Sequence, residues 1–402
     1  MPEINLVCFL RGASMRIAVL FDLKDSKAGG AFSFNYSLYK YILEHKLELP
    51  HEFVTVFSQN TDSNYFPDIA LPSKFTYRFY FSLKFFTSFW RIDLIRHRLL
   101  LNSCRAFFLD SKFKKHKIDA VWAVQPLSIN LHVPYLTTSW DISHAITPYF
   151  HEVSKFGVER SKRDVICRRI FSGAFRIVVG TDQGKQEIAM AYGVNFERIL
   201  VNPFPTNSEP SRKNLVRDKT KFLYPANFWP HKNHALLLKS FAEAVHKSNL
   251  PLRLVLTGSD KGTLSDMKEL VHQLSIDDNV EFAGFISKDE LEYYYWTANA
   301  VIFPSLIGPD NLPPLEALGY GCRILVADIP GAFDQFGHFA SYFDPYNQEK
   351  LSACIIDHLE SFDSNSRINP DLDVFLASRS TEKYVTNICR EFDKIRHIVR
   401  YL

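Results

Sequence analysis

The sequence has few cysteines, and their spacing pairs none of them. Six cysteines are scattered along 402 residues: Cys8, Cys104, Cys167, Cys322, Cys354 and Cys389. This distribution excludes a disulfide framework and a zinc site built on paired cysteines. It is typical of a protein from a reducing compartment.

Long apolar runs are also missing. No run approaches the roughly 20 residues that are needed to cross a bilayer. The N-terminus has no basic residues ahead of the apolar run Ile4–Leu10, unlike a signal peptide. We therefore expect a cytoplasmic protein in which residues 1–14 form an N-terminal extension before the strand-like run 15–21.

A GxGxxG fingerprint follows none of the strand-like runs, which argues against a dinucleotide cofactor. Gly29 and Gly30 follow the first run, where they either allow a ligand close to the backbone or form a plain turn. The pair His231 and His234 has no third metal ligand nearby. The Asp-x-Asp sequence at 371–373 has no apolar strand before it, so we expect a solvated loop there. We expect no cofactor and no required metal.

What the chain does contain is a regular alternation of strand-like and helical segments, in two successive sets. With 46% hydrophobic residues and 402 residues in total, the chain is globular and long enough for two domains. Alternating strands and helices predict parallel, doubly wound sheets, and the polar stretch 206–219 is predicted to link them. Ligands of such folds bind at the carboxyl ends of the strands, so a cleft is expected between two facing domains.

Basic charge is concentrated in one stretch. Residues 74–117 hold 11 Lys and Arg against 2 Asp and Glu, together with 12 aromatic residues. Such a stretch suits an anionic membrane surface. The alternative is a core-packing helix pair with a solvated basic face. Nucleic acid is not expected, because no known nucleic-acid-binding signature accompanies the stretch.

The segment 308–317, Gly-Pro-Asp-Asn-Leu-Pro-Pro-Leu-Glu-Ala, follows an apolar strand-like run and leads into a short helix. Asn311 is a favourable N-cap, and the first turn of a helix binds anions through its free N–H groups. The two prolines cannot donate, which leaves the amides of Asn311, Leu312 and Leu315. Glu316 lies one turn further on, where it can accept hydrogen bonds from a diol. An anion beside a diol describes a nucleotide phosphate beside its ribose.

Several ordered segments together resemble a known family. They are Asn227–His234, Val280–Phe285, Pro304–Ala327, Thr138–His144 and Phe150–Ser154. From Met15 to about Pro345 the chain resembles the retaining glycosyltransferases of family 4, and the last two segments resemble the subgroup that builds bacterial surface polysaccharide and lipopolysaccharide. The resemblance implies an α/β protein of the GT-B fold, two facing Rossmann-like doubly wound domains with a central cleft. It implies an acceptor-side domain over 15–205, a donor-binding domain over 206–379, and a C-terminal helix, about 380–402, that packs back onto the first domain.

The resemblance also assigns roles in binding the donor. Lys232 is similar to the lysine that neutralises the donor diphosphate, and Glu316 to the second glutamate of the Glu-x7-Glu motif, which binds the ribose. Position 308, where the first glutamate would stand, is glycine. Asp310 or nearby backbone amides are candidates for its contact with the sugar. Further expected donor contacts are Gly29, Gly30, Gly284, Phe285, Asn311, Leu312 and Leu315.

In the first domain, the resemblance places His144 near the reacting end of the donor sugar. The alternative is a buried structural histidine. Asp141 is expected either to bind acceptor hydroxyls or to orient His144, and the alternative is a turn aspartate. Arg160 is expected to contact the acceptor, although a solvated helix start accounts for it equally well.

The expected activity is transfer of a hexose of mannosyl or glucosyl type, with retention, from a nucleotide diphosphate sugar to a lipid-linked glycan. The expected place is the inner face of the cytoplasmic membrane, reached as a peripheral protein through residues 74–117. One alternative is a nucleotide-sugar epimerase or hydrolase. The other is a catalytically silent GT-B module, for which the glycine at position 308 is the main argument.

Overall fold

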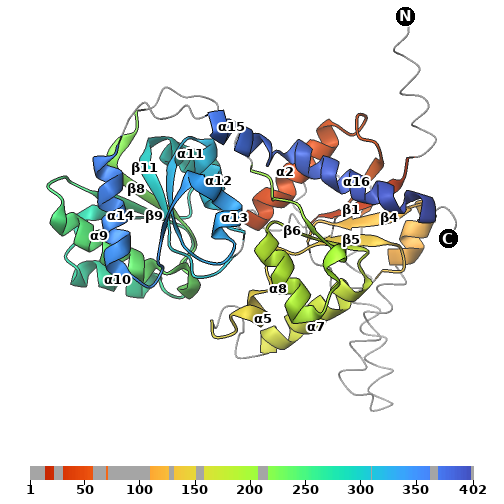
Figure 1. Cartoon of the computed structure of the whole chain (residues 1–402), viewed down its shortest axis with the longest axis horizontal. Coiled ribbons are helices and arrows are strands. Elements are labelled where there is room, and N and C mark those ends of the chain that lie inside the picture. Colours follow the sequence, from red (N-terminus) through yellow and green to blue (C-terminus); the bar gives the residue numbers. More distant parts are fainter. Residues whose placement is uncertain are drawn as a thin grey trace, which may run out of the picture.

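The computed structural model describes residues 14–21, 30–57, 69–70, 109–125, 131–150, 158–206, 216–308, 310–362 and 370–399. Within these ranges the chain forms two α/β domains, visible as two lobes in Figure 1. Each domain is built on a sheet whose paired strands are all parallel. The two parallel α/β sheets predicted from the sequence are confirmed.

The N-terminal domain has a seven-stranded sheet of order β3-β2-β1-β4-β5-β6-β7. Its strands are β1 (Arg16–Phe21), β2 (Glu52–Phe57), β3 (Ile69–Ala70), β4 (Ala120–Ala123), β5 (Tyr135–Thr138), β6 (Arg176–Val179) and β7 (Ile199–Val201). Its helices are α2 (Gly30–Glu44), α5 (Ser143–Ile146), α7 (Val158–Gly173) and α8 (Asp182–Tyr192). The strand order reverses between β1 and β4, which is where a doubly wound sheet opens a crevice for ligands.

The C-terminal domain has a six-stranded sheet of order β10-β9-β8-β11-β12-β13. Its strands are β8 (Asp218–Pro225), β9 (Arg253–Thr257), β10 (Val280–Gly284), β11 (Ala298–Phe303), β12 (Arg323–Ala327) and β13 (Ala340–Phe343). Its helices are α9 (His234–Lys247), α10 (Leu264–Gln273), α11 (Lys288–Thr297), α12 (Leu312–Gly319), α13 (Ala332–Phe336) and α14 (Gln348–Glu360). Here the order reverses between β8 and β11.

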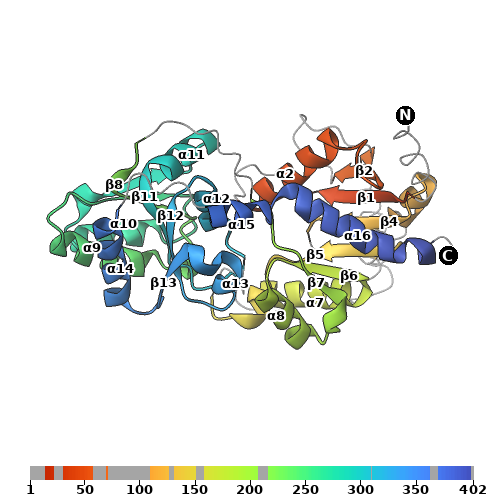
Figure 2. The same ribbon diagram turned by 45° about the horizontal axis from the view of Figure 1, so that its top comes forward.

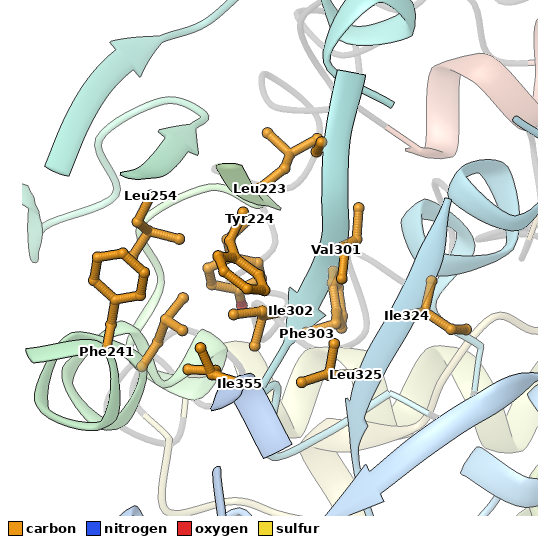
Figure 3. Packing of buried hydrophobic residues seen from close by; sticks show 14 of the residues in the cluster. Leu223, Tyr224, Phe241, Leu254, Val301, Ile302, Phe303, Ile324, Leu325 and Ile355 are labelled. Carbon is orange, nitrogen blue, oxygen red and sulfur yellow. The ribbon is translucent and has the colours of Figure 1, made fainter. Parts of the chain in front are cut away.

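Burial on both faces of the sheet explains the apolar composition of these strands. All six residues of β11 are buried, which suits a central parallel strand covered by helices on both sides. Figure 3 shows side chains of the C-terminal core, among them Phe241 of α9, Leu254 of β9 and Ile302 of β11. Fully burying one such side chain contributes about 1.5–3 kcal/mol. Packing of this core therefore fixes the positions of the strand ends, from which the polar loops begin.

The end of the chain returns to the first domain. Helices α15 (Pro370–Ala377) and α16 (Thr381–Val399) lead from the C-terminal lobe back across the N-terminal lobe, as Figures 1 and 2 show. The buried side chains Tyr384, Ile388 and Phe392 of α16 belong to the same cluster as Phe34 of α2 and Trp122 of β4. The last helix is therefore part of the N-terminal core.

The structure corrects three details of the sequence analysis. The short edge strands β3 and β7 were not predicted, because two or three residues carry no periodicity. The linker ends before Asp218, since this residue pairs with Ala298 as the first residue of β8. The Asp-x-Asp sequence lies in the first turn of α15 and not in a loop. Pro370 at the helix start and acidic residues in the first turn favour that helix.

Most of the basic, aromatic stretch lies outside the described residues. In its described part, Phe113 is fully buried in the N-terminal core while Lys114 and Lys117 are exposed. That part matches the alternative of a packing element with a solvated basic face. Among the described residues, no helix is both long and apolar enough to span a membrane.

Candidate functional site

Lys232 stands where the strand order of the C-terminal sheet reverses. The chain leaves β8 and forms a short turn, Pro230–Lys232, before α9 begins. The Lys232 ammonium lies 3.3 Å from Ser305 Oγ and 3.3 Å from Asn311 Oδ1. It also lies 5.0 Å from the centre of the Phe303 ring. Since Phe303 ends β11, the ammonium occupies the crevice between the carboxyl ends of β8 and β11.

The surroundings of this ammonium leave its charge uncompensated. Burial lowers the pKa of Lys232 to about 8, and the charge of Asp141 in the N-terminal domain only partly opposes that effect. Among the described residues, no carboxylate lies within ion-pair distance of it. Lys232 is half-buried, and a partly desolvated cation that has only a hydroxyl and an amide as acceptors is costly; an anionic ligand would relieve that cost.

The loop before α12 is built differently from the expected N-cap. The Asn311 side chain makes no capping bond, because its amide donates to the Gly308 carbonyl (2.8 Å) and its oxygen faces Lys232. The backbone N–H of Asn311 donates to Gln335 Oε1 (2.9 Å), and Gln335 Nε2 donates back to the Asn311 carbonyl (3.0 Å). The Asn311 amide is therefore occupied by Gln335, contrary to the prediction that it is free for an anion. Leu315 is fully buried in the core.

Gly308 has a backbone that other residues rarely adopt. Its φ is +111°, and a Cβ placed there would lie 3.0 Å from Asn311 Oδ1. A glutamate at this position would be strained and would crowd the asparagine that faces Lys232. The loop at Gly308 thus has a conformation that a glutamate at this position could adopt only with strain.

Glu316 lies half-buried on α12 and accepts a hydrogen bond from the Tyr295 hydroxyl of α11 (3.1 Å). Burial raises the pKa of Glu316, while this hydrogen bond and the charge of Lys288 lower it. Tyr295 is buried and holds one carboxylate oxygen in place. The other oxygen remains for a ligand.

At the far end of the C-terminal sheet, Gly284 closes β10 and its carbonyl accepts from the Gly258 N–H (2.7 Å). Phe285 follows with about half of its surface exposed (51%). Beside the loop before α12 there is a small cavity of about 10 Å3, whose lining includes Ser305, Gly308 and Asn311.

The N-terminal domain contributes two side chains with different surroundings. The His144 ring is fully buried, and its Nε2 lies 2.9 Å from the Tyr192 hydroxyl, while its Nδ1 has no partner. Burial lowers the pKa of His144 to about 4, so the ring is neutral at pH 7. Asp141 accepts from the Ser143 N–H (2.8 Å) and from Arg163 (3.2 Å). Asp141 thus lies in a turn and forms an ion pair with Arg163, and its contact with an acceptor stays a prediction.

The remaining predicted site residues are Gly29, Gly30, Arg160 and Asp310. Gly29 lies outside the described residues, whereas Gly30 opens α2 and its Cα faces Leu312, since a Cβ there would lie 3.8 Å from Leu312 Cδ1. Arg160 is exposed on α7, and its charge contributes to the low pKa of His144. Asp310 reaches across to Gly180, at the end of β6.

No group of three His, Cys, Asp or Glu side chains that could hold a metal ion occurs in the described ranges. His234 is buried between the rings of Tyr224 (4.6 Å) and Phe228 (4.4 Å), and burial lowers its pKa to about 3. The histidine is therefore a core residue.

The structure adds three partners that sequence reasoning missed, namely Ser305, Tyr295 and Gln335. All three lie in buried positions. Ser305 stands two residues after the end of β11, the strand that ends beside Lys232, which is a signal in the sequence. Tyr295 and Gln335 carry no such signal, because each meets its partner only through packing of separate helices.

Comparison with known proteins identifies similar proteins for the second half of the chain. Residues 206–370 match the family model of glycosyl transferases group 1. The O-antigen chain mannosyltransferase RfbU of Salmonella typhimurium is 25% identical over 224 residues, 55% of this chain and 58% of its own length. Mannosylfructose-phosphate synthase of Agrobacterium fabrum is 23% identical over 274 residues, 61% of this chain and 60% of its own length. The chain thus matches about 60% of the length of these relatives.

Solved structures share the architecture over nearly the whole chain. The lipopolysaccharide outer core galactosyltransferase WaaB has a TM-score of 0.61 at 14% identity, with 96% of this chain and 100% of that chain covered. Anabaena Alr3699/HepE in complex with UDP has a TM-score of 0.64 at 14% identity, with 94% and 100% covered. At such identities these likenesses show the fold alone. Together with the match over 206–370, they support the resemblance seen in the sequence: the chain has the two-domain GT-B fold, and its residues 206–370 are similar to glycosyl transferases group 1.

Proposed function

We propose that this protein transfers a hexosyl group, with retention, from a nucleotide diphosphate sugar to a glycan acceptor. The observation that carries the proposal is the half-buried Lys232 ammonium, which lies between Ser305 and Asn311 and lacks a carboxylate partner among the described residues. A diphosphate is the anion that such a position suits. Glu316 on α12, which accepts one hydrogen bond from Tyr295, is the carboxylate proposed to bind the ribose diol.

In the proposed reaction, the bond between the sugar's anomeric carbon and the diphosphate oxygen breaks, and a bond to the acceptor oxygen forms on the same face. The leaving diphosphate takes the acceptor's proton, so no protein base is required. His144 is a poor base at pH 7, since its pKa is lowered to about 4. The protein then acts through Lys232, which stabilises the negative charge that develops on the leaving group.

For the acceptor, we propose a lipid-linked glycan of a surface polysaccharide, with the protein bound at the inner face of the membrane. Two relatives are named O-antigen chain mannosyltransferases, which makes a mannosyl donor the first to test. The basic, aromatic stretch 74–117 supports contact with an anionic membrane. A metal ion is not part of the proposed mechanism.

The test is nucleotide release from GDP-mannose, UDP-glucose and UDP-galactose, each with and without a lipid extract of bacterial membranes. Release that requires the extract, together with a radiolabelled sugar in the lipid fraction, is the expected result. Release without any acceptor would instead identify a hydrolase. Binding without turnover in every combination would identify a catalytically silent module.

A further inference from the structure

The loop before α12 is anchored so that one side chain projects toward the other domain. Gln335, which is almost fully buried, holds Asn311 by two hydrogen bonds to its backbone. The Asn311 side chain ties the same loop back to the Gly308 carbonyl (2.8 Å). Asp310 lies between these anchors. Its carboxyl group is directed away from the C-terminal sheet, onto the end of β6.

In the N-terminal domain, a glycine leaves the space that this carboxyl group occupies. A Cβ added to Gly180 would lie 1.9 Å from Asp310 Oδ1 and 2.5 Å from its Cγ, so only glycine fits. The Gly180 N–H donates a hydrogen bond to the carboxyl group. The other oxygen, Oδ2, is buried without a partner. Asp310 borders a small cavity whose lining comes mostly from the N-terminal domain and includes Asp141 and Glu187.

We infer that Asp310 is a positioning residue that holds the two domains closed over the donor site, through the contact of its carboxyl group with Gly180. A neighbouring contact joins the domains too, since the Gln183 N–H donates to Asp334 Oδ2 (3.3 Å). Small-molecule sites measure roughly 300–1,000 Å3. The cavities beside Asp310 and beside Gly308 are far smaller, about 10 Å3 each. A nucleotide sugar therefore enters after this contact opens, and the contact forms again over it.

The contact between Asp310 and Gly180 depends on whether the Asp310 carboxyl group is protonated. The pKa of Asp310 is raised to about 8, mainly by burial and to a smaller extent by the nearby carboxylates Glu187 and Asp141. The Arg379 guanidinium and the Gly180 N–H lower it, but they do not outweigh burial. In an open form, the solvated carboxyl group returns to its ordinary value of 3.8. Closing therefore takes up a proton between these two values.

Closing of the two domains should therefore depend on pH. Because the closed form holds the proton more tightly, closing is favoured at low pH and is lost as the pH rises toward 8. Because closing takes up one proton, the equilibrium constant for closing falls about tenfold for each unit by which the pH rises in that window. Between pH 5 and pH 7 it falls by about 100-fold. Above pH 8 both forms are ionised, and the dependence levels off.

Small-angle X-ray scattering of the full chain at pH 5.5, 7 and 8.5 tests this inference. The wild type should be compact at pH 5.5 and extended at pH 8.5. Asp310→Asn, which keeps the shape and the acceptor but cannot ionise, should give the same profile at all three values. Gly180→Ala, which blocks the seat of the carboxyl group, should be extended at all three. Asp328→Asn, at an exposed carboxylate of the same domain, should behave as the wild type.

An unchanged wild-type profile across the series would overturn the inference, and so would a full pH response in Asp310→Asn. A compact Gly180→Ala with native circular dichroism would overturn it as well. The scattering experiment needs neither donor nor acceptor. The inference rests on the proposed function only for its role in catalysis, so a failure of the transfer assay is distinguishable from a failure of the closing contact.

Discussion

Replacing Lys232 by methionine should separate stability from donor binding. Methionine has a similar length and no charge, so it preserves most of the packing against Phe303. In the wild type, the shift of the Lys232 pKa from 10.5 to about 8 corresponds to roughly 3 kcal/mol against the charged form, at 1.36 kcal/mol per unit. The two hydrogen bonds to Ser305 and Asn311 are 3.3 Å long, beyond the usual range, so each is counted at the low end, about 0.5 kcal/mol, and their loss offsets about 1 kcal/mol.

The variant should therefore be more stable than the wild type by about 2 kcal/mol at pH 7. For a domain of this size, that raises the unfolding midpoint by roughly 4–8 °C. The folded-state pKa of the lysine is lowered, so the penalty is complete below about pH 8 and disappears above pH 10.5. Differential scanning calorimetry at pH 7, 9 and 10.5 should show the difference between the two proteins shrinking along the series.

Donor binding should change in the opposite direction. A hydrogen bond to a charged group contributes about 1.5–3 kcal/mol, so the affinity for UDP or GDP should fall by roughly 10- to 150-fold. Lys239→Met, at an exposed lysine of α9, is the matched control and should alter neither property. A Lys232→Met protein that is less stable than the wild type at pH 7 would refute the reasoning, because it would show that the ammonium is already compensated. Wild-type affinity would remove Lys232 from the site.

Three further outcomes are expected. Glu316→Gln should lower nucleotide affinity by about tenfold, whereas Tyr295→Phe, which only frees the carboxylate, should have a smaller effect in the same titration. Gly308→Glu restores the motif in sequence, yet it should destabilise the protein by about 1–3 kcal/mol in urea unfolding, because of the positive φ and the crowding of Asn311; unchanged stability would mean that the loop is free to relax. Neutralising four basic residues within 74–117 should release the protein from phosphatidylserine vesicles in flotation, and unchanged binding would rule out this stretch as the membrane contact.

Much of the fold could be predicted because its signals are local. A fully apolar run such as the one ending at Phe303 identifies a central strand by composition, and the turn residues around it set its limits. The same holds for Lys232, which stands at a strand-to-helix junction. The short edge strands β3 and β7 escaped prediction, because two or three residues are stabilised only by the neighbour with which they pair.

The sequence by itself determined two parallel α/β domains, a cation at the end of one strand and a carboxylate at the start of a helix. Only the tertiary structure decided which polar atoms meet. Lys232 and Asn311 are 79 positions apart, and the Asn311 backbone is bound by Gln335 and not left open for an anion. Gly180 accommodates Asp310 of the other domain, which no local pattern indicates. Hydrophobic periodicity is a property of neighbouring residues, whereas the partners of a buried polar atom depend on how separate elements pack.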